Sequence, residues 1–228
     1  MDGAIDSGTL PVATVGNGSQ DSSDLFPFVV RVASGGESCS GTLVSRRHVV
    51  TAAHCLCPRS GVHQDSSRCN PSASVTFRSY LSGTTTRVDS CSLIVNSGFA
   101  MTFESDTSKG LTSSTNDIAV VVLGSDAPTW ASSARLPPYS PKVKDNIVVV
   151  GYGNTSCNPL WANISNLDGN RFFGANSIAR VLSDGDRVCI DKAADDLYES
   201  LTSLGDSGIP SIVSVYGRTV AGHGNMFG

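Results

Sequence analysis

Short apolar runs separated by stretches rich in Gly, Ser, Thr and Asn dominate the pattern along this chain of 228 residues. The runs favour Val and Ile, and helical periodicity is scarce, so the pattern predicts an all-β protein. One segment, 191–201, has the spacing of a short helix. The predicted strands are Phe28 to Ala33, Gly41 to Val44, His48 to Ala52, Ser74 to Phe77, Ser92 to Val95, Ile118 to Leu123, Ile147 to Val150, Ser177 to Leu182 and Ser211 to Val215.

Composition supports this class and excludes two kinds of partner. Sixteen basic and 20 acidic side chains give a net charge of −4 with no basic cluster, so no nucleic-acid partner is expected. No apolar run is long enough to span a bilayer, so no membrane partner is expected either. The first residues are acidic and polar, unlike a signal peptide, so we expect that a leader was removed or lies upstream of Met1.

The strongest chemical signal is Gly205-Asp206-Ser207-Gly208. A serine hydroxyl is a weak nucleophile, so it needs a base to take its proton and fixed donors for the charge that develops on an attacked carbonyl oxygen. The two glycines permit a tight backbone in which the N–H groups of Gly205 and Ser207 form that oxyanion hole. Taken alone, the same four residues also fit an ordinary turn.

A histidine and an aspartate complete the set. His54 follows an apolar run that ends in two alanines, whereas His48 lies beside arginines, His63 in a polar loop and His223 among glycines. Asp117 opens an apolar strand, where its charge is costly unless it is hydrogen-bonded, and an imidazole N–H would satisfy it. Taken singly, a core histidine and a strand-capping aspartate are the commoner explanations.

The order His54, Asp117, Ser207 is the one known for peptidases of the chymotrypsin type. With Ser40-Gly41-Thr42-Leu43-Val44, Val49 to Cys55 and the segment around Ser207, the chain resembles the trypsin/chymotrypsin family of serine endopeptidases from about Val15 onward. Gly151-Tyr152-Gly153 resembles a turn of that family.

The resemblance implies two antiparallel six-stranded β-barrels. We expect a pro-segment or leader remnant at 1–14, a barrel with His54 and Asp117 at 15–125, and a barrel with Ser207 at 126–228. Only Ile209 to Gly228 follow the serine motif, so the second barrel is expected to be truncated. The resemblance further implies a protein or peptide substrate, a protein protease inhibitor as a possible partner, a monomer and no cofactor.

Seven cysteines favour disulfides, and hence secretion. The resemblance pairs Cys39 with Cys55. Cys157 could bridge to Cys189, and we favour Cys57 with Cys69, which leaves Cys91 free. The spacings do not form paired Cys-x-x-Cys knuckles, so no metal site is expected.

Family members are usually cleaved to create an N-terminal ammonium that pairs with the aspartate before the nucleophile, here Asp206. Thr14-Val15-Gly16-Asn17 resembles the mature N-terminus, so cleavage is expected before Thr14 or Val15, although no basic residue precedes the cut. An unpaired, buried Asp206 would be costly.

Aligned on Ser207, the resemblance places Leu201 at the base of the primary pocket. Thr202 lies beside it, and Gly222-His223-Gly224 form one wall. Trypsin-like members carry an Asp at the base, so Leu201 predicts cleavage after uncharged residues.

Two other functions stay open. A non-catalytic or zymogen-locked homologue could act as a protein-binding module, which the short C-terminal part favours and the complete triad opposes. An esterase of the α/β-hydrolase type is disfavoured because the chain order differs and no Gly-x-Ser-x-Gly elbow is present.

Overall fold

A computed structural model describes residues 19–58, 60, 62–103, 111–135, 142, 144, 146–152, 170–181, 188–190, 210–215 and 218–223. Within these ranges the protein is all-β, as predicted, with a single 3₁₀ turn at Ser66–Arg68. The segment 191–201, predicted as a helix, lies outside the described residues.

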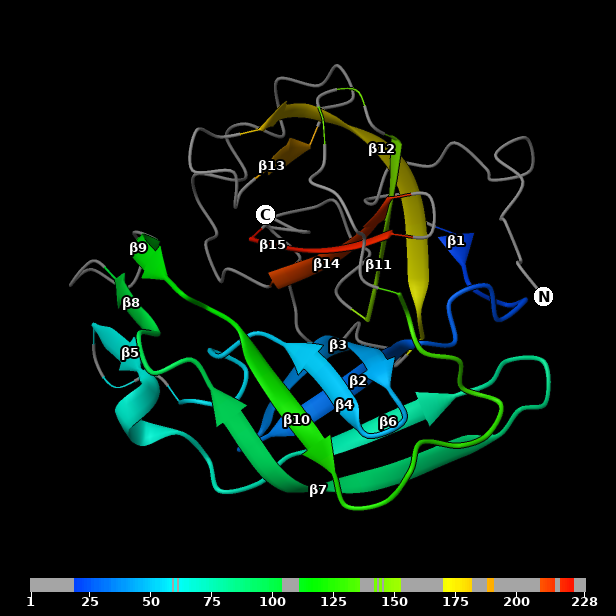
Figure 1. Ribbon diagram of the computed structural model, residues 1–228, viewed down its shortest axis with the longest axis horizontal. Helices are drawn as coiled ribbons and strands as arrows, with labels where there is room; N and C mark the ends of the chain where they lie inside the picture. The colour runs from blue at the N-terminus through cyan, green and yellow to red at the C-terminus, as the bar shows by residue number, and fades with distance from the viewer. Residues whose placement is uncertain are drawn as a thin grey trace, which may run out of the picture.

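Six strands form a closed antiparallel barrel in the order β10-β4-β3-β2-β6-β7 (Figure 1). Its interior is filled by alternate residues of these strands, including Val30, Leu43, Val75 and Val121, each without exposed surface. The bounds are β2 Val29–Ser34, β3 Glu37–Ser45, β4 His48–Thr51, β6 Ser74–Arg78, β7 Thr85–Val95 and β10 Ala119–Leu123.

A second antiparallel sheet of six strands lies on one side of this barrel (Figure 1). Its order is β1-β12-β11-β14-β15, with β13 paired to β12. Strand β14 also contacts β3 of the barrel. The bounds are β1 Ser19–Gln20, β11 Asn146–Gly151, β12 Phe172–Val181, β13 Val188–Ile190, β14 Pro210–Val215 and β15 Arg218–His223.

A third sheet, which the sequence pattern did not predict, has the order β5-β8-β9 and lies at one end of the barrel (Figure 1). Its strands are β5 His63–Asp65, β8 Ala100–Phe103 and β9 Leu111–Thr115. The prediction that His63 lies in a polar loop is therefore wrong: its segment is polar, but the backbone pairs with Thr102. Short polar strands carry little apolar alternation, which is why the pattern missed them.

The barrel and the second sheet share a small apolar core. Phe26 packs on Phe173 with ring centroids 5.2 Å apart, and Val150 and Tyr152 join them. The Tyr152 hydroxyl donates to Val29 O at 3.3 Å, and burial raises the pKa of Tyr152 to about 12. This tyrosine is therefore a neutral donor at physiological pH.

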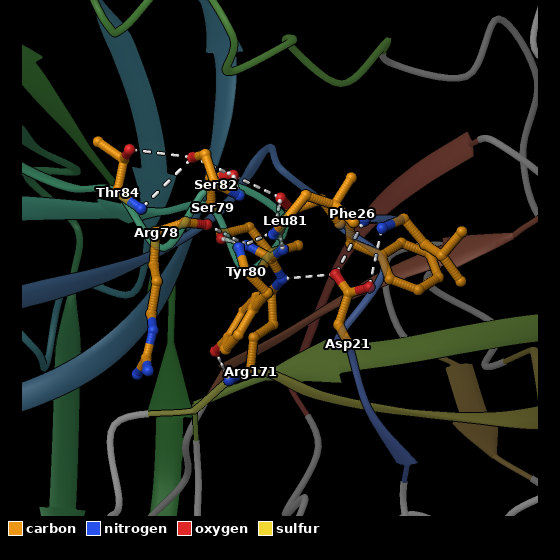
Figure 2. A network of polar contacts seen from close by, with 12 residues as sticks. Asp21, Phe26, Arg78, Ser79, Tyr80, Leu81, Ser82, Thr84 and Arg171 are labelled. Atoms are coloured by element: carbon orange, nitrogen blue, oxygen red, sulfur yellow. Dashed lines mark hydrogen bonds and ion pairs between the residues drawn. The ribbon is translucent and has the colours of Figure 1, made fainter.

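Beside this core, the guanidinium of Arg171 is fully buried. It joins the two β units of the protein, which are the closed barrel and the second sheet (Figure 2). Its Nε donates to Asp21 Oδ2 at 2.7 Å, and its Nη2 donates to Asp24 Oδ1 at 3.0 Å. Nη1 donates to Val29 O at 3.2 Å, and the backbone N–H of Arg171 donates to the Tyr80 hydroxyl. Arg171 directly precedes β12 of the second sheet. Asp21 and Asp24 lie just before the first barrel strand, Val29 begins that strand, and Tyr80 follows β6.

Asp24 is a partly accessible member of this network, with a side chain 11% exposed. Burial alone raises the pKa of Asp24, but hydrogen bonds from Tyr80 N, Ser79 Oγ and Leu81 N, together with the charge of Arg171, outweigh it. The net result is a pKa below 3.8, so Asp24 is ionised at neutral pH.

Among the described residues no helix is long and apolar enough to cross a membrane.

Arg171→Met is expected to lower the free energy of unfolding by about 3–5 kcal/mol, because two carboxylates would be left in the junction without their cation. Urea unfolding followed by tryptophan fluorescence measures this loss. The control is Arg87→Met, which removes an ion pair whose side chains are 68% and 72% exposed and should cost at most about 1 kcal/mol. Equal losses in the two variants would contradict the assigned role of Arg171.

Asp24→Asn is expected to cost about 1–3 kcal/mol at neutral pH, because it weakens hydrogen bonds to an ionised acceptor. Asn tolerates the positive φ of 52° at this position. Because the folded-state pKa of Asp24 is depressed, its stabilisation is present above about pH 4 and is lost as the pH falls through that pKa.

The stability difference between wild type and Asp24→Asn should therefore shrink below about pH 4. Urea unfolding over a series of pH values tests this, with the exposed Asp126→Asn as control. A difference that does not change with pH would contradict the assignment.

Candidate active site

His54 lies on a single turn that follows β4. Thr51 anchors the end of the strand, since its hydroxyl donates to Ser40 O at 2.9 Å. Ala52 and Ala53, which precede His54, have no exposed surface. The N–H groups of Leu56 and Cys57 then both donate to Ala53 O, at 2.9 and 3.1 Å, which closes the turn.

Asp117 lies between β9 and β10 and faces this turn. Its Oδ1 accepts from the backbone N–H of His54 at 2.8 Å, and its Oδ2 lies 2.6 Å from His54 Nδ1. The Asp117 side chain has no exposed surface, while the His54 side chain is 15% exposed. Asn116, with a φ of 50°, provides the bend that aims Asp117 inward.

This geometry determines what the imidazole can do. A carboxylate only accepts hydrogen bonds, so Nδ1 of His54 carries the proton of this contact. In the neutral ring, Nε2 then holds the lone pair that can accept a proton. This arrangement is chemically capable of accepting a proton at Nε2, with a buried carboxylate beside the imidazolium that would form.

Two disulfides hold the segment around His54. Cys39 of β3 is bonded to Cys55, and Cys57 is bonded to Cys69, both as predicted. Cys91 is free, also as predicted, and it is exposed. Nitrogen and sulfur atoms of Cys39, His54 and Cys55 lie within 4.8 Å of one another, but the two sulfurs are bonded to each other and cannot ligate a metal as thiolates.

A contact that the sequence pattern did not indicate also fixes the turn. Gln64 of β5 is buried, and its Nε2 donates to His54 O at 2.7 Å and to Cys57 O. A glutamine in a polar segment carries no local signal of such a role. Only the unusual burial reveals it.

The other predicted site residues are described only in part. Gly222 and His223 end β15, opposite Ser211 and Pro210 of β14. Their side chains, and that of Cys189 in β13, are not described. The remaining predicted residues lie outside the described ranges: Thr14, Val15, Cys157, Leu201, Thr202, Gly205, Asp206, Ser207 and Gly224.

A closed six-stranded barrel beside a second antiparallel sheet is the arrangement of the chymotrypsin-type fold. The chain belongs to the trypsin family, because the sequence profile of that family matches residues 15–224. No curated protein matches the chain in sequence.

Solved structures agree on the fold. One is neuropsin, a serine protease expressed in the limbic system of mouse brain, with 19% identity over 86% of this chain and 80% of that chain, and a TM-score of 0.54. Another is human heparin binding protein, with 18% identity over 89% of this chain and 81% of that chain, and a TM-score of 0.55. At these identities the likeness shows the fold alone.

Proposed function

We propose that the protein is a serine endopeptidase in which Ser207 is the nucleophile, His54 the general base and Asp117 the group that orients the imidazole. The observation that carries the proposal is the contact of 2.6 Å between His54 Nδ1 and a fully buried Asp117 carboxylate, in a chain of the trypsin family. Burying a carboxylate costs free energy, and the hydrogen bonds that Asp117 makes to one turn are a small return unless the pair also transfers protons.

The position of β14 supports the inclusion of Ser207. This strand begins at Pro210, three residues after Ser207, and it contacts β3. Strand β3 is in turn tied to the His54 turn by the Cys39–Cys55 disulfide. Strand β14, which follows Ser207 in the chain, thus lies against a strand that is covalently tied to the His54 turn.

The proposed reaction has two halves. The Ser207 oxygen bonds to the scissile carbonyl carbon while its proton passes to His54 Nε2, and the amine leaves with that proton. Water then attacks the acyl-enzyme, His54 takes the water proton and returns it to Ser207, and the acid leaves. The N–H groups of Gly205 and Ser207 would stabilise the oxyanion in both halves, an effect of about 3–4 kcal/mol per donor.

Specificity and processing are parts of the same proposal. Leu201 at the pocket base favours uncharged side chains before the cleaved bond, with Thr202 and Gly222 to Gly224 around it. The two disulfides suit an oxidising compartment, so we propose a secreted enzyme. Cleavage before Thr14 or Val15 would supply the ammonium partner of Asp206.

The alternative is a homologue that binds a protein and does no chemistry. Heparin binding, which the name of one similar structure states for that protein, has no support here, since a chain of net charge −4 would not attract a polyanion.

Labelling by a fluorophosphonate probe, followed by mass spectrometry, tests the proposal on the full chain and on a form released at Val15 through an engineered cleavage site. Ser207→Ala should abolish labelling. Asp117→Asn should slow it by up to about 10⁴-fold, the loss in kcat that this change causes in trypsin-type triads, because the wrong tautomer is held. Asp126→Asn, an exposed carboxylate, is the matched control.

If neither form is labelled while both unfold cooperatively, the enzyme proposal is wrong and the binding-module alternative stands. Labelling at a residue other than Ser207 would also contradict it.

A further inference from the structure

We propose that Gln64 is a positioning residue for His54: its side-chain amide caps the turn that carries the base and so couples the β5-β8-β9 sheet to the active site. The consequence for reactivity rests on the proposed peptidase function. The positioning itself rests on described contacts alone.

The turn needs such a cap. Carbonyl groups at the end of a helical turn have no partner within it, and buried carbonyls without a partner are costly. Three carbonyls are concerned, those of His54, Leu56 and Cys57. Asn70 N donates to Leu56 O at 2.8 Å, and Gln64 Nε2 supplies the other two, with His54 O at 2.7 Å.

The chemistry of the glutamine matches this task. A primary amide nitrogen has two hydrogens, and the two oxygens it faces are carbonyls that can only accept. The orientation of the amide is therefore determined by its partners. The residue is only 8% exposed, so water is a poor substitute for its amide.

With this cap, His54 is held at three points. Its N–H and Nδ1 contact Asp117, and its carbonyl contacts Gln64 from the other end of the residue. A shift of the turn would stretch the contact of 2.6 Å between Nδ1 and the carboxylate. It would also move Nε2, the atom that must reach the nucleophile.

Gln64 is itself fixed by its strand. It pairs with Met101 of β8, which is 2% exposed and belongs to the barrel core. The Cys57–Cys69 disulfide closes the segment that contains Gln64 onto the turn it caps. The third sheet therefore supports the base through the carbonyl of His54, whereas Asp117 contacts its N–H and Nδ1.

Gln64→Glu tests this with nearly the same shape, because a carboxylate cannot donate to either carbonyl. Gln64→Met removes the donors without adding a charge. Both variants are expected to slow labelling of Ser207 by about 10–100-fold, the range caused by displacing a catalytic group by up to about 1 Å. Both should also shift or broaden the low-field ¹H resonance of the His54 Nδ1–H bonded to Asp117.

Two controls separate positioning from general stability. His63→Gln changes an exposed neighbour on the same strand and should alter neither signal. Val75→Ala weakens the barrel core away from the turn, so well below its unfolding temperature it should keep the labelling rate and the resonance. Wild-type values in both Gln64 variants would overturn the inference.

Failure of the peptidase proposal would look different. A wild-type protein that is not labelled would overturn that proposal. The ¹H resonance of His54 Nδ1–H would still show whether the Gln64 variants disturb the turn. In the wild-type chain, slow solvent exchange of the Gln64 amide protons and couplings across hydrogen bonds to the carbonyls of His54 and Cys57 are expected. Rapid exchange without such couplings would contradict the cap even if no variant folds.

Discussion

The structure depends on the burial of one guanidinium. Arg171 has no contact with solvent, so each of its donors needs a fixed acceptor, and an uncompensated charge there would cost several kcal/mol. Asp21 and Asp24 supply the counter-charges, and the backbone of Val29 supplies a further acceptor. These contacts join Arg171, the residue before β12, to the start of the barrel, so the network helps to fix the second sheet against the barrel.

That junction matters because the proposed chemistry is divided between the two units. His54 and Asp117 belong to the closed barrel, whereas Ser207 lies in the part of the chain that follows β13 and precedes β14. A rotation of one unit on the other would separate nucleophile and base without disturbing either unit's own core. Apolar contacts such as Phe26 on Phe173 resist separation, but they tolerate sliding better than directed ion pairs do.

Much of the barrel could be predicted from the sequence, because several of its strands are short apolar runs between polar turns, such as the predicted Ile118 to Leu123, observed as Ala119–Leu123. The pairing of Cys57 with Cys69 was favoured, and Cys39 with Cys55 was implied by the resemblance. The Arg171 network was not predicted, since Arg171 and Asp21 are separated by 150 positions in sequence and leave no local signal. Gln64 was missed for the related reason that a polar side chain in a polar segment looks solvated until its burial is known. The serine side of the site stays a prediction.

The most direct test of the central claim is a crystal structure of the protein after reaction with a fluorophosphonate. Phosphorus should be bonded to Ser207 Oγ, and Nε2 of His54 should lie within hydrogen-bond reach, about 3 Å, of that oxygen or of the adduct. The contacts of Asp117 and Gln64 to His54 should be intact in the same crystal. An unmodified Ser207, or one held on the far side of the Arg171 junction from His54, would contradict it.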